Sequence, residues 1–336
     1  MSTFDYLSSR ILTHYSDIER LDKFPPPRMM ILYPTYACNA KCGYCEYKGD
    51  LGKTEMPWEM LRDVVGQAAT FGVKSIELCG GGEPTLHPHF PALCQLIVDS
   101  GMKLGMLTNG WGLVYREIIP FLAEHASYVR ISLDAATHTT YSKVKGLDRE
   151  YFNLLMGAIQ RLAVLRAESC KVSAKFLLTP DNYTEVVLMA RKARALGLDS
   201  AQFKVVRGTQ DLTSEQHEVA RGLLALAREE VRGIRIMGDL HHPIMREKCR
   251  LCQLYTLVDA DGSMYLCCYF RHRKDTHYIG SLHNEPLRTI WGGRRHREAM
   301  AGIRPEACNI FDCRFVDYHR IAQELIWEGE GQFEFL

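Results

Sequence analysis

Three cysteines within eight residues form the first candidate site of this sequence. Cys38, Cys42 and Cys45 follow a C-x3-C-x2-C spacing. Thiolates are the usual ligands of iron–sulfur clusters, and most electron-transfer clusters take four of them. Three thiolates on one short loop can each bind one iron of a cubic [4Fe–4S] cluster, which leaves the fourth iron open. We therefore predict a cluster with one iron reserved for a substrate or a cofactor.

A zinc site is the alternative for the same three cysteines. Zinc takes four nitrogen or sulfur ligands, and its cysteines usually come as two pairs. A lone triplet fits that pattern poorly, so we prefer the iron–sulfur interpretation.

Alternating apolar runs and amphipathic stretches predict the elements that carry this loop. The apolar run at 29–33 predicts a strand that ends just before the cysteine loop. Further strands are expected at 75–79, 103–107, 128–133, 172–178 and 201–206, with helices at 57–71, 89–100, 113–125, 149–168, 183–196 and 214–231. Six strand–helix units predict an α/β fold with a parallel sheet, too short to close an eight-stranded barrel. Catalytic groups of such a fold belong at the C-terminal ends of the strands.

The region after Gly233 departs from this alternation, because the strand–helix units stop and cysteine, tryptophan and arginine become frequent. We divide the chain accordingly into an N-terminal helix and proline linker at 1–28, a partial barrel at 29–235 and a small C-terminal domain at 236–336. The N-terminal helix is expected at 4–22, on an apolar stripe.

Composition limits the compartment and the partners. Basic and acidic residues number 41 and 40, a balance that gives no support to binding of nucleic acid or of membrane surfaces. No run approaches the roughly 18 apolar residues of a membrane span, and the N-terminus lacks the apolar region of a secretory signal. Twelve cysteines without such a signal favour metal binding in a reducing compartment, so we expect a cytoplasmic protein. Cys79, Cys94 and Cys170 lie in apolar surroundings and are interpreted as small buried hydrophobic residues.

A second group of six cysteines follows the alternating units. Residues 258–267 predict a hairpin that turns at Asp261-Gly262, within a C-x9-G-x4-C pattern. Four cysteines of such a group satisfy an iron–sulfur cluster without an open iron, and they equally satisfy tetrahedral zinc. The six members are Cys249, Cys252, Cys267, Cys268, Cys308 and Cys313.

The first cysteine triplet and a glycine-rich motif together resemble the radical S-adenosylmethionine (radical SAM) family. Tyr44 precedes the third cysteine, where the family carries an aromatic residue beside the adenine. The motif Gly81-Gly82-Glu83-Pro84 follows an apolar run and is similar to the family motif that binds the methionine amino group. The resemblance implies a partial (β/α)6 barrel, reductive cleavage of SAM, and a 5′-deoxyadenosyl radical that abstracts hydrogen from carbon. It also implies a reductant protein such as flavodoxin or ferredoxin.

Polar residues at further strand ends are candidates for binding SAM in a protein that resembles this family. Family members use polar side chains at these places for the ribose and the carboxylate of SAM. Alternatively, each is an ordinary turn or cap residue. The candidates are Asn109, Ser132, Asp134 and Lys175.

The second cysteine group resembles the SPASM extension of the radical SAM family, which holds auxiliary iron–sulfur clusters. The C-x2-C-x5-C-x3-C block of the full extension is absent, so the resemblance is to its shortened twitch form with one auxiliary [4Fe–4S] cluster. The resemblance implies a cluster with four protein ligands and a role in electron transfer. The implied ligands are Cys252, Cys267, Cys308 and Cys313. Cys268 is then expected to pack on the opposite face of the hairpin.

Cys249 remains as a thiol that faces the barrel mouth, is itself a ligand or has a merely structural role. A substrate radical can take a hydrogen atom from an S–H group on its opposite face, which inverts the carbon. The thiyl left behind needs a proton and an electron, and a nearby cluster can supply the electron. In this respect the chain resembles the aminoglycoside-tailoring radical SAM enzymes, in particular those of the neomycin C epimerase type. The resemblance implies an epimerase that inverts one ring carbon of an aminoglycoside or aminosugar, with Cys249 as the hydrogen donor.

Two other reactions of the same fold remain open. A dehydrogenase would oxidise an aminocyclitol or sugar alcohol with the auxiliary cluster as electron acceptor, and a peptide-modifying SPASM enzyme would act on a polypeptide. Aminoglycosides are polycationic, so the epimerase interpretation predicts carboxylates at the barrel mouth. Glu46, Asp239, Glu247 and Asp259 are the candidates, unless each is a solvated surface charge.

Overall fold

The computed structural model describes residues 23–52, 54–206, 211–238, 244–308 and 315–323, together with His14, Asp17, Leu240 and Cys313. The helix predicted at 4–22 lies, apart from His14 and Asp17, outside the described residues, and so does the candidate Asp239.

One sheet of ten strands forms the centre of the fold, in the order β10-β9-β8-β1-β2-β3-β4-β5-β6-β7. Neighbouring strands from β1 to β7 are parallel, and β8 also pairs parallel with β1, on the side away from β2. Two antiparallel pairings then join β8 to β9 and β9 to β10. The strands are β1 (Met29–Leu32), β2 (Ser75–Leu78), β3 (Lys103–Thr108), β4 (Ala126–Ser132), β5 (Lys171–Leu178), β6 (Ser200–Val205), β7 (Arg235–Met237), β8 (Tyr255–Val258), β9 (Ser263–Tyr265) and β10 (Tyr278–Ser281).

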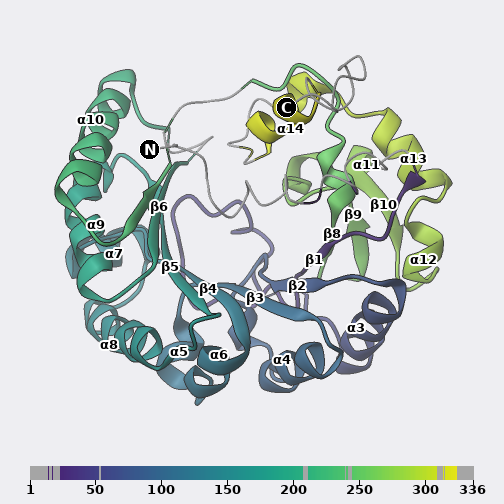
Figure 1. The fold of residues 1–336 in the computed structure, drawn as a ribbon, viewed down its shortest axis with the longest axis horizontal. Helices are drawn as coiled ribbons and strands as arrows, with labels where there is room; N and C mark the ends of the chain where they lie inside the picture. Colours follow the sequence, from purple (N-terminus) through teal and green to yellow (C-terminus); the bar gives the residue numbers. More distant parts are fainter. Residues whose placement is uncertain are drawn as a thin grey trace, which may run out of the picture.

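The sheet curves into an open arc, with helices on its outer side and the loop after β1 inside it (Figure 1). The helices are α3 (Trp58–Phe71), α4 (Phe90–Asp99), α5 (Trp111–Tyr115), α6 (Ile119–His125), α7 (His138–Lys145), α8 (Arg149–Leu165), α9 (Val186–Ala195), α10 (Ser214–Glu230), α11 (Lys274–His277), α12 (Leu287–Ile290), α13 (Arg294–Ala301) and α14 (Val316–Ala322).

The period of two along each strand separates the core from the interior of the arc. On β4, Val129 and Ile131 are fully buried, and they alternate with the polar Arg130 and Ser132. On β5, Ala174 and Phe176 are likewise fully buried and alternate with Lys175. The apolar set packs under the helices, so the polar set is left to line the inside of the arc.

The six predicted strands are confirmed to within two residues at either end, and so is the hairpin, whose turn residue Gly262 has a φ of 76°. The helix predicted at 113–125 is divided into α5 and α6, because Arg116 is extended and Pro120 opens α6 in the first turn, where proline fits. Helix α7 is absent from the prediction because its largely polar sequence carries little apolar periodicity.

The parallel sheet also continues further than the sequence predicts. Strand β7 pairs with β6 after Gly233, where the alternation is predicted to stop. Strand β8 extends the sheet at its other end, so that the second cysteine group is attached directly to the sheet through β8 and β9.

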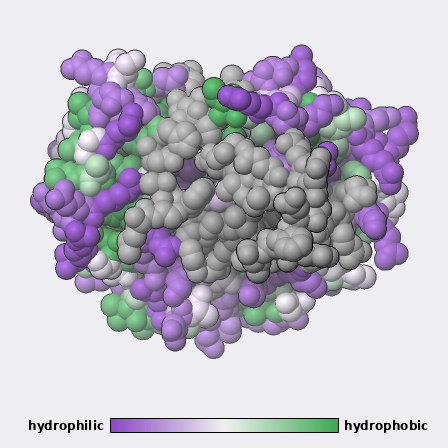
Figure 2. All heavy atoms as spheres, turned by 45° about the horizontal axis from the view of Figure 1, so that its top comes forward, coloured by the Kyte–Doolittle hydropathy of each residue, from purple (hydrophilic) through white to green (hydrophobic). Residues whose placement is uncertain are grey.

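The described surface is largely hydrophilic on the face shown in Figure 2. A hydrophobic area lies at its left, on the side of α9 and α10, which expose Leu188, Val219 and Leu226. None of the helices in the described ranges combines the length and the apolar character that a membrane crossing requires.

Candidate functional site

The loop that carries the first three cysteines is fixed to the sheet by backbone hydrogen bonds. The N–H of Lys41 donates to the carbonyl of Lys145 at the end of α7 (2.9 Å). The N–H of Glu83, after β2, donates to the carbonyl of Ala37 (2.7 Å). The side-chain amide of Asn109, after β3, donates to Oδ1 of Asn39 (2.8 Å). The ends of three neighbouring elements therefore determine where the cysteine loop lies.

This anchoring brings Cys38, Cys42 and Cys45 to the wall of one cavity of about 360 Å³ inside the arc. All three cysteines are partly exposed. Most of the predicted SAM contacts line the same cavity, namely Tyr44, Gly81, Gly82, Glu83, Asn109, Ser132 and Lys175.

The glycine motif packs directly against the cysteine loop. A Cβ at Gly82 would lie 2.2 Å from the carbonyl oxygen of Ala37, and one at Gly81 would lie 2.3 Å from the ring of Tyr36. Such distances exclude any side chain, so these glycines permit the close approach of two backbone segments.

The Glu83 carboxylate accepts hydrogen bonds from other residues of the protein. Its Oε1 accepts hydrogen bonds from the hydroxyls of Thr85 and Thr108 (2.6 Å each), and its Oε2 accepts one from the N–H of Asn109 (2.6 Å). Burial raises the pKa of Glu83, while these hydrogen bonds oppose the rise. Glu83 therefore joins the loops after β2 and β3, and this organising role is one that the motif alone does not indicate.

Asp134 lies behind the cavity wall as the centre of a second network. Its Oδ2 accepts hydrogen bonds from the hydroxyls of Tyr44 (2.5 Å) and Ser132 (2.7 Å) and from the Lys145 ammonium (2.7 Å). Its Oδ1 accepts one from the N–H of Leu177 (2.7 Å). Burial acts to raise the pKa of Asp134, but the Lys145 charge and the hydrogen bonds lower it overall. Asp134 thus positions Tyr44 and Ser132, and it is not itself among the residues that line the cavity.

The charges along the cavity differ from those that the sequence predicts for an aminoglycoside site. Of the four candidate carboxylates, Glu46 lines the cavity. Placing Asp259 at the barrel mouth is wrong, because this residue is 1% exposed and its carboxylate bonds the Tyr36 hydroxyl. Glu247 is exposed and lies outside the lining. The lining instead includes the cations Arg130, Lys145, Lys175 and Lys204.

The interpretation of Cys79 as a buried packing residue also changes. Its side chain lines the cavity beside Gly80, because it has the same strand parity as Glu77 and points into the arc. Burial raises the pKa of Cys79 to about 12, so it is a neutral thiol at pH 7. Cys94 and Cys170 are buried as predicted.

The second cysteine group surrounds a smaller pocket between the β8–β9 hairpin and the segment that follows α13. Five of its six thiols line this pocket, namely Cys249, Cys252, Cys267, Cys308 and Cys313. Arg273 lies among them and donates hydrogen bonds to the sulfurs of Cys308 (3.2 Å) and Cys267 (3.4 Å). Cys268 is outside this lining, as predicted, although Cys267 and Cys268 lie in the turn that follows β9 and not on the strand.

The two sets of thiols fit iron–sulfur clusters better than they fit a single metal ion. Among the described residues, no three His, Cys, Asp or Glu side chains converge on a point where a single metal ion would sit. The thiols instead surround cavities, four at the first site, where Cys79 joins the three loop cysteines, and five at the second. Three thiolates beside a glycine-lined wall fit a [4Fe–4S] cluster with an open iron and SAM, and the second set fits an auxiliary cluster held by thiolates.

Three residues at these two sites are not predicted from the sequence. Lys145 lies on the unpredicted α7, and Arg273 follows the hairpin without any motif, so neither carries a local signal. Arg130 has a detectable signal, since its position two residues before Ser132 on a predicted strand places both side chains on the same face.

Comparisons with known proteins agree with both sites. A family model of the radical SAM superfamily matches residues 32–200, and a model of the SPASM iron–sulfur cluster-binding domain matches residues 233–314. The curated protein "Mycofactocin maturase MftC" of Mycobacterium tuberculosis is 22% identical over 302 residues, which cover 83% of this chain and 75% of that protein. The "PqqA peptide cyclase" of Granulibacter bethesdensis is 20% identical over 311 residues, which cover 87% of this chain and 82% of that protein.

The fold resembles that of SuiB from Streptococcus suis, which was crystallised with its precursor peptide SuiA. The TM-score is 0.66 at 16% sequence identity, over 87% of this chain and 72% of that chain. The radical SAM domain brings with it a [4Fe–4S] cluster and SAM, and the SPASM domain brings auxiliary iron–sulfur chemistry. The radical SAM model alone matches half of the sequence, and this chain therefore belongs to the radical SAM superfamily.

Proposed function

We propose that this protein is a radical SAM enzyme that modifies a peptide, with an electron-transferring auxiliary cluster in its C-terminal region. The observation that carries this proposal is the similarity in overall architecture to SuiB, a protein solved with its precursor peptide. The similarity over most of the chain to a peptide cyclase supports the same substrate class.

The shape of the sheet is compatible with a polymeric substrate. The sheet ends at β10 and β7, so it has two edges and does not close into a barrel (Figure 1). A sheet with two edges does not enclose its interior as a closed barrel does, so it does not restrict the substrate to groups that fit the end of a barrel. When bound, the first cluster and SAM supply a 5′-deoxyadenosyl radical that abstracts hydrogen from a substrate carbon.

The chain's own residues have separate tasks in this proposal. Cys38, Cys42 and Cys45 hold three irons, and the backbone at Gly81 and Gly82 lies against the cysteine loop. Asn109 and Ser132 contact SAM beside Tyr44. Cys252, Cys267, Cys308 and Cys313 hold the auxiliary cluster. In this proposal residues 29–235 form the barrel that binds SAM, and residues 236–336 form the region that binds the auxiliary cluster.

The test compares substrate classes on one preparation. The protein is reconstituted without oxygen, given SAM and dithionite, and incubated either with a library of synthetic peptides or with a panel of aminosugars. We expect peptides to raise 5′-deoxyadenosine formation above the substrate-free rate and to change in mass. Turnover of an aminosugar without turnover of any peptide would contradict the proposal.

Inversion of an aminosugar carbon is the second candidate, and Cys249 is the observation in its favour. Five thiols surround the auxiliary pocket, whereas a four-ligand cluster uses four of them. In this candidate Cys249 gives its hydrogen atom to the substrate radical, and the thiyl regains one electron from the auxiliary cluster and one proton from water. Against it, Cys249 is absent from the lining of the first cavity, and the cations of that cavity oppose a polycationic substrate.

Replacing Cys249 with Ala separates these possibilities. If Cys249 is the hydrogen donor, the C249A variant should keep the iron and sulfide of both clusters and still cleave SAM, but it should not invert the substrate. If it is a ligand, the variant should instead lose auxiliary iron. A dehydrogenase of the same fold is recognised by a product two mass units lighter than its substrate.

A further inference from the structure

We propose that Arg130 and Lys175 form a binding site for a carboxylate of the substrate. The site lies in the cavity of Cys38, Cys42 and Cys45, on the side toward the N-terminal ends of the strands. The inference rests on the proposed function in one respect, namely that a peptide offers such a group as an Asp or Glu side chain or as its C-terminus.

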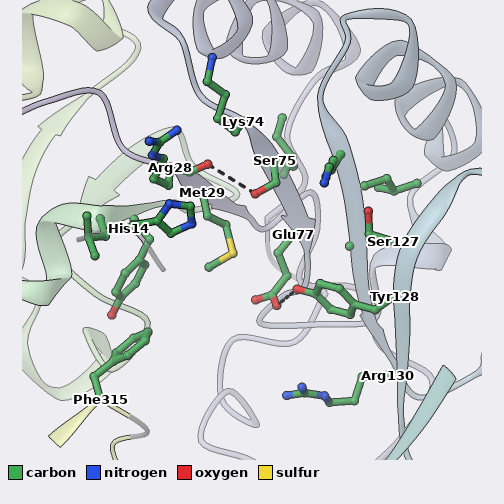
Figure 3. Close-up of a pocket in the computed structure, with 16 residues that line it drawn as sticks. His14, Arg28, Met29, Lys74, Ser75, Glu77, Ser127, Tyr128, Arg130 and Phe315 are labelled. Atoms are coloured by element: carbon green, nitrogen blue, oxygen red, sulfur yellow. Dashed lines mark hydrogen bonds between the residues drawn. The ribbon is translucent and has the colours of Figure 1, made fainter. Parts of the chain in front are cut away.

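Arg130 is a buried cation that has no partner among the residues that the structure describes. The residue is 7% exposed, and its Nε has no hydrogen-bond partner. No described residue forms an ion pair with its guanidinium. Figure 3 shows the guanidinium extending beside the joined Glu77 and Tyr128 side chains without an interaction to either. A buried charge in this state destabilises the folded protein unless something pairs with it.

Two other buried charged residues of the chain, unlike Arg130, have partners. Lys145 is 2% exposed, and its ammonium lies 2.7 Å from Asp134. Glu77 is 4% exposed and accepts a hydrogen bond from the Tyr128 hydroxyl. Tyr128 can reach Glu77 because the intervening residue is Gly105, where a Cβ would lie 2.5 Å from the Tyr128 ring. The Glu77 carboxylate, which lines the cavity of Figure 3 together with Arg130, is therefore bonded to Tyr128 and not to Arg130.

Lys175 faces the same cavity from the next strand. Burial and the neighbouring charges of Lys204 and Arg130 lower the pKa of Lys175, against the opposing effect of Asp134. Two cations that repel each other across one cavity become mutually favourable when an anion lies between them. A carboxylate suits this pair, because a guanidinium can bind both of its oxygens and an ammonium can add a third contact.

The depth of Arg130 separates this site from the SAM carboxylate. The strand register pairs Ser132 with Lys175, whereas Arg130 pairs with Ser173, two residues nearer the N-terminal ends of the strands. At about 3.3 Å per residue, the Arg130 Cα lies roughly 7 Å below the layer of the predicted SAM contacts. A second cavity, shown in Figure 3 and named the lower cavity, lies toward the N-terminal ends of the strands, and Arg130 lines it too. Arg130 therefore lies at the boundary between the lower cavity and the cavity of the cysteine loop. A group held there belongs to a molecule that reaches deeper than SAM.

The binding test uses a matched pair of small probes. N-acetyl-L-glutamate methylamide carries one side-chain carboxylate, and N-acetyl-L-glutamine methylamide has the same shape without charge. Each is titrated calorimetrically into the reconstituted holoenzyme with saturating SAM. We expect the acid to bind at least tenfold more tightly than the amide, and Arg130→Met to remove that difference while SAM affinity and iron content stay unchanged.

Lys103→Met is the control, because Lys103 lines only the lower cavity. Equal binding of the two probes would overturn the proposal. So would a loss of acid binding in K103M as large as in R130M, since the anion would then sit in the lower cavity.

Stability gives a second readout that needs no ligand. If Arg130 is an unpaired buried cation, the apolar R130M variant should unfold at the same or a higher temperature than the wild type. The acid probe should raise the unfolding temperature of the wild type alone. A lower unfolding temperature for unliganded R130M would mean that Arg130 is structural, and would overturn the proposal.

The outcome is distinguishable from that of the proposed function. Selective binding of the acid probe combined with turnover of aminosugars alone would leave the carboxylate site standing and remove the peptide assignment. Peptide turnover with equal binding of both probes would do the reverse.

Discussion

The hydroxyl of Tyr36 lies 2.6 Å and 2.7 Å from the two carboxylate oxygens of Asp259, across 223 residues of sequence. Tyr36 precedes the first cysteine loop, and Asp259 follows β8 in the C-terminal region. The Tyr36 ring also lies over Gly81. One side chain therefore connects the cysteine loop, the glycine motif and the hairpin that carries the second cysteine group.

Tyr36→Phe should destabilise the protein by about 1–3 kcal/mol, because the buried Asp259 carboxylate loses its side-chain donor. The free energy of unfolding from denaturant titration measures this change. Tyr183→Phe is a control, since Tyr183 begins a 3-10 turn that follows β5 in the chain and packs against α9 and α10. In a double-mutant cycle, Y36F combined with Asp259→Asn should cost less than the sum of the single changes. Strict additivity would show that the two residues do not interact.

Arg273 should tune the auxiliary cluster. Its guanidinium donates hydrogen bonds to the sulfurs of Cys267 and Cys308, and a cation near thiolate ligands stabilises the reduced, more negative cluster. We expect Arg273→Gln to shift the midpoint potential of the auxiliary cluster to a more negative value. A redox titration followed by electron paramagnetic resonance measures the shift.

Arg295→Gln serves as the control for Arg273, since Arg295 is exposed and donates to the carbonyl of Asp275. Both variants should keep the wild-type iron and sulfide content. An unchanged potential in R273Q with full cluster content would rule out this role.

Lys145→Met should cost about 3–5 kcal/mol at pH 7, because it leaves the buried Asp134 carboxylate without its cation. Lys143→Met on the same helix should cost less than about 1 kcal/mol, because Lys143 forms an exposed pair with Asp181. Denaturant titration of the two variants provides the comparison, and equal losses would contradict the central place given to Asp134.

The same pair predicts a pH dependence. Burial acts to raise the pKa of Asp134, but the Lys145 charge and the hydrogen bonds to the carboxylate together lower it below its ordinary value in the folded protein. The carboxylate therefore contributes stability that is present above about pH 4 and is lost as the pH falls through the folded pKa. In K145M the buried carboxyl is no longer favoured in its charged form, so the difference in unfolding free energy between wild type and variant should shrink on acidification. A difference that stays constant from pH 7 to pH 3 would contradict this account.

Gly82→Ala should reduce iron loading at the first site. Its Cβ would lie 2.2 Å from the Ala37 carbonyl, so the cysteine loop must move away from the glycine motif. Gly66→Ala is the matched control, because Gly66 lies inside α3 with nothing within 4 Å of an added Cβ, and alanine there should stabilise by about 0.5–1 kcal/mol. Iron and sulfide analysis after reconstitution distinguishes the two, and full loading of G82A would show that the loop tolerates the displacement.

The sequence by itself determined the strand–helix alternation, the cysteine loop after β1 and the glycine motif after β2. These features are local, because hydrophobic periodicity and residue spacing act over a few residues. The same local logic led to two errors. It assigned Cys79 to packing by its apolar neighbours, although strand parity turns its thiol inward. It also left Asp259 as either a carboxylate of the barrel mouth or a solvated surface charge, although this residue is buried.

Only the tertiary structure decided which distant groups meet. The pairing of Asp134 with Lys145, the grouping of five thiols around Arg273, and the isolation of Arg130 from Glu77 all depend on how strands align across the sheet. Strand register is set by the whole set of buried contacts, so a charge and its partner, or a charge without one, cannot be recognised from a linear pattern.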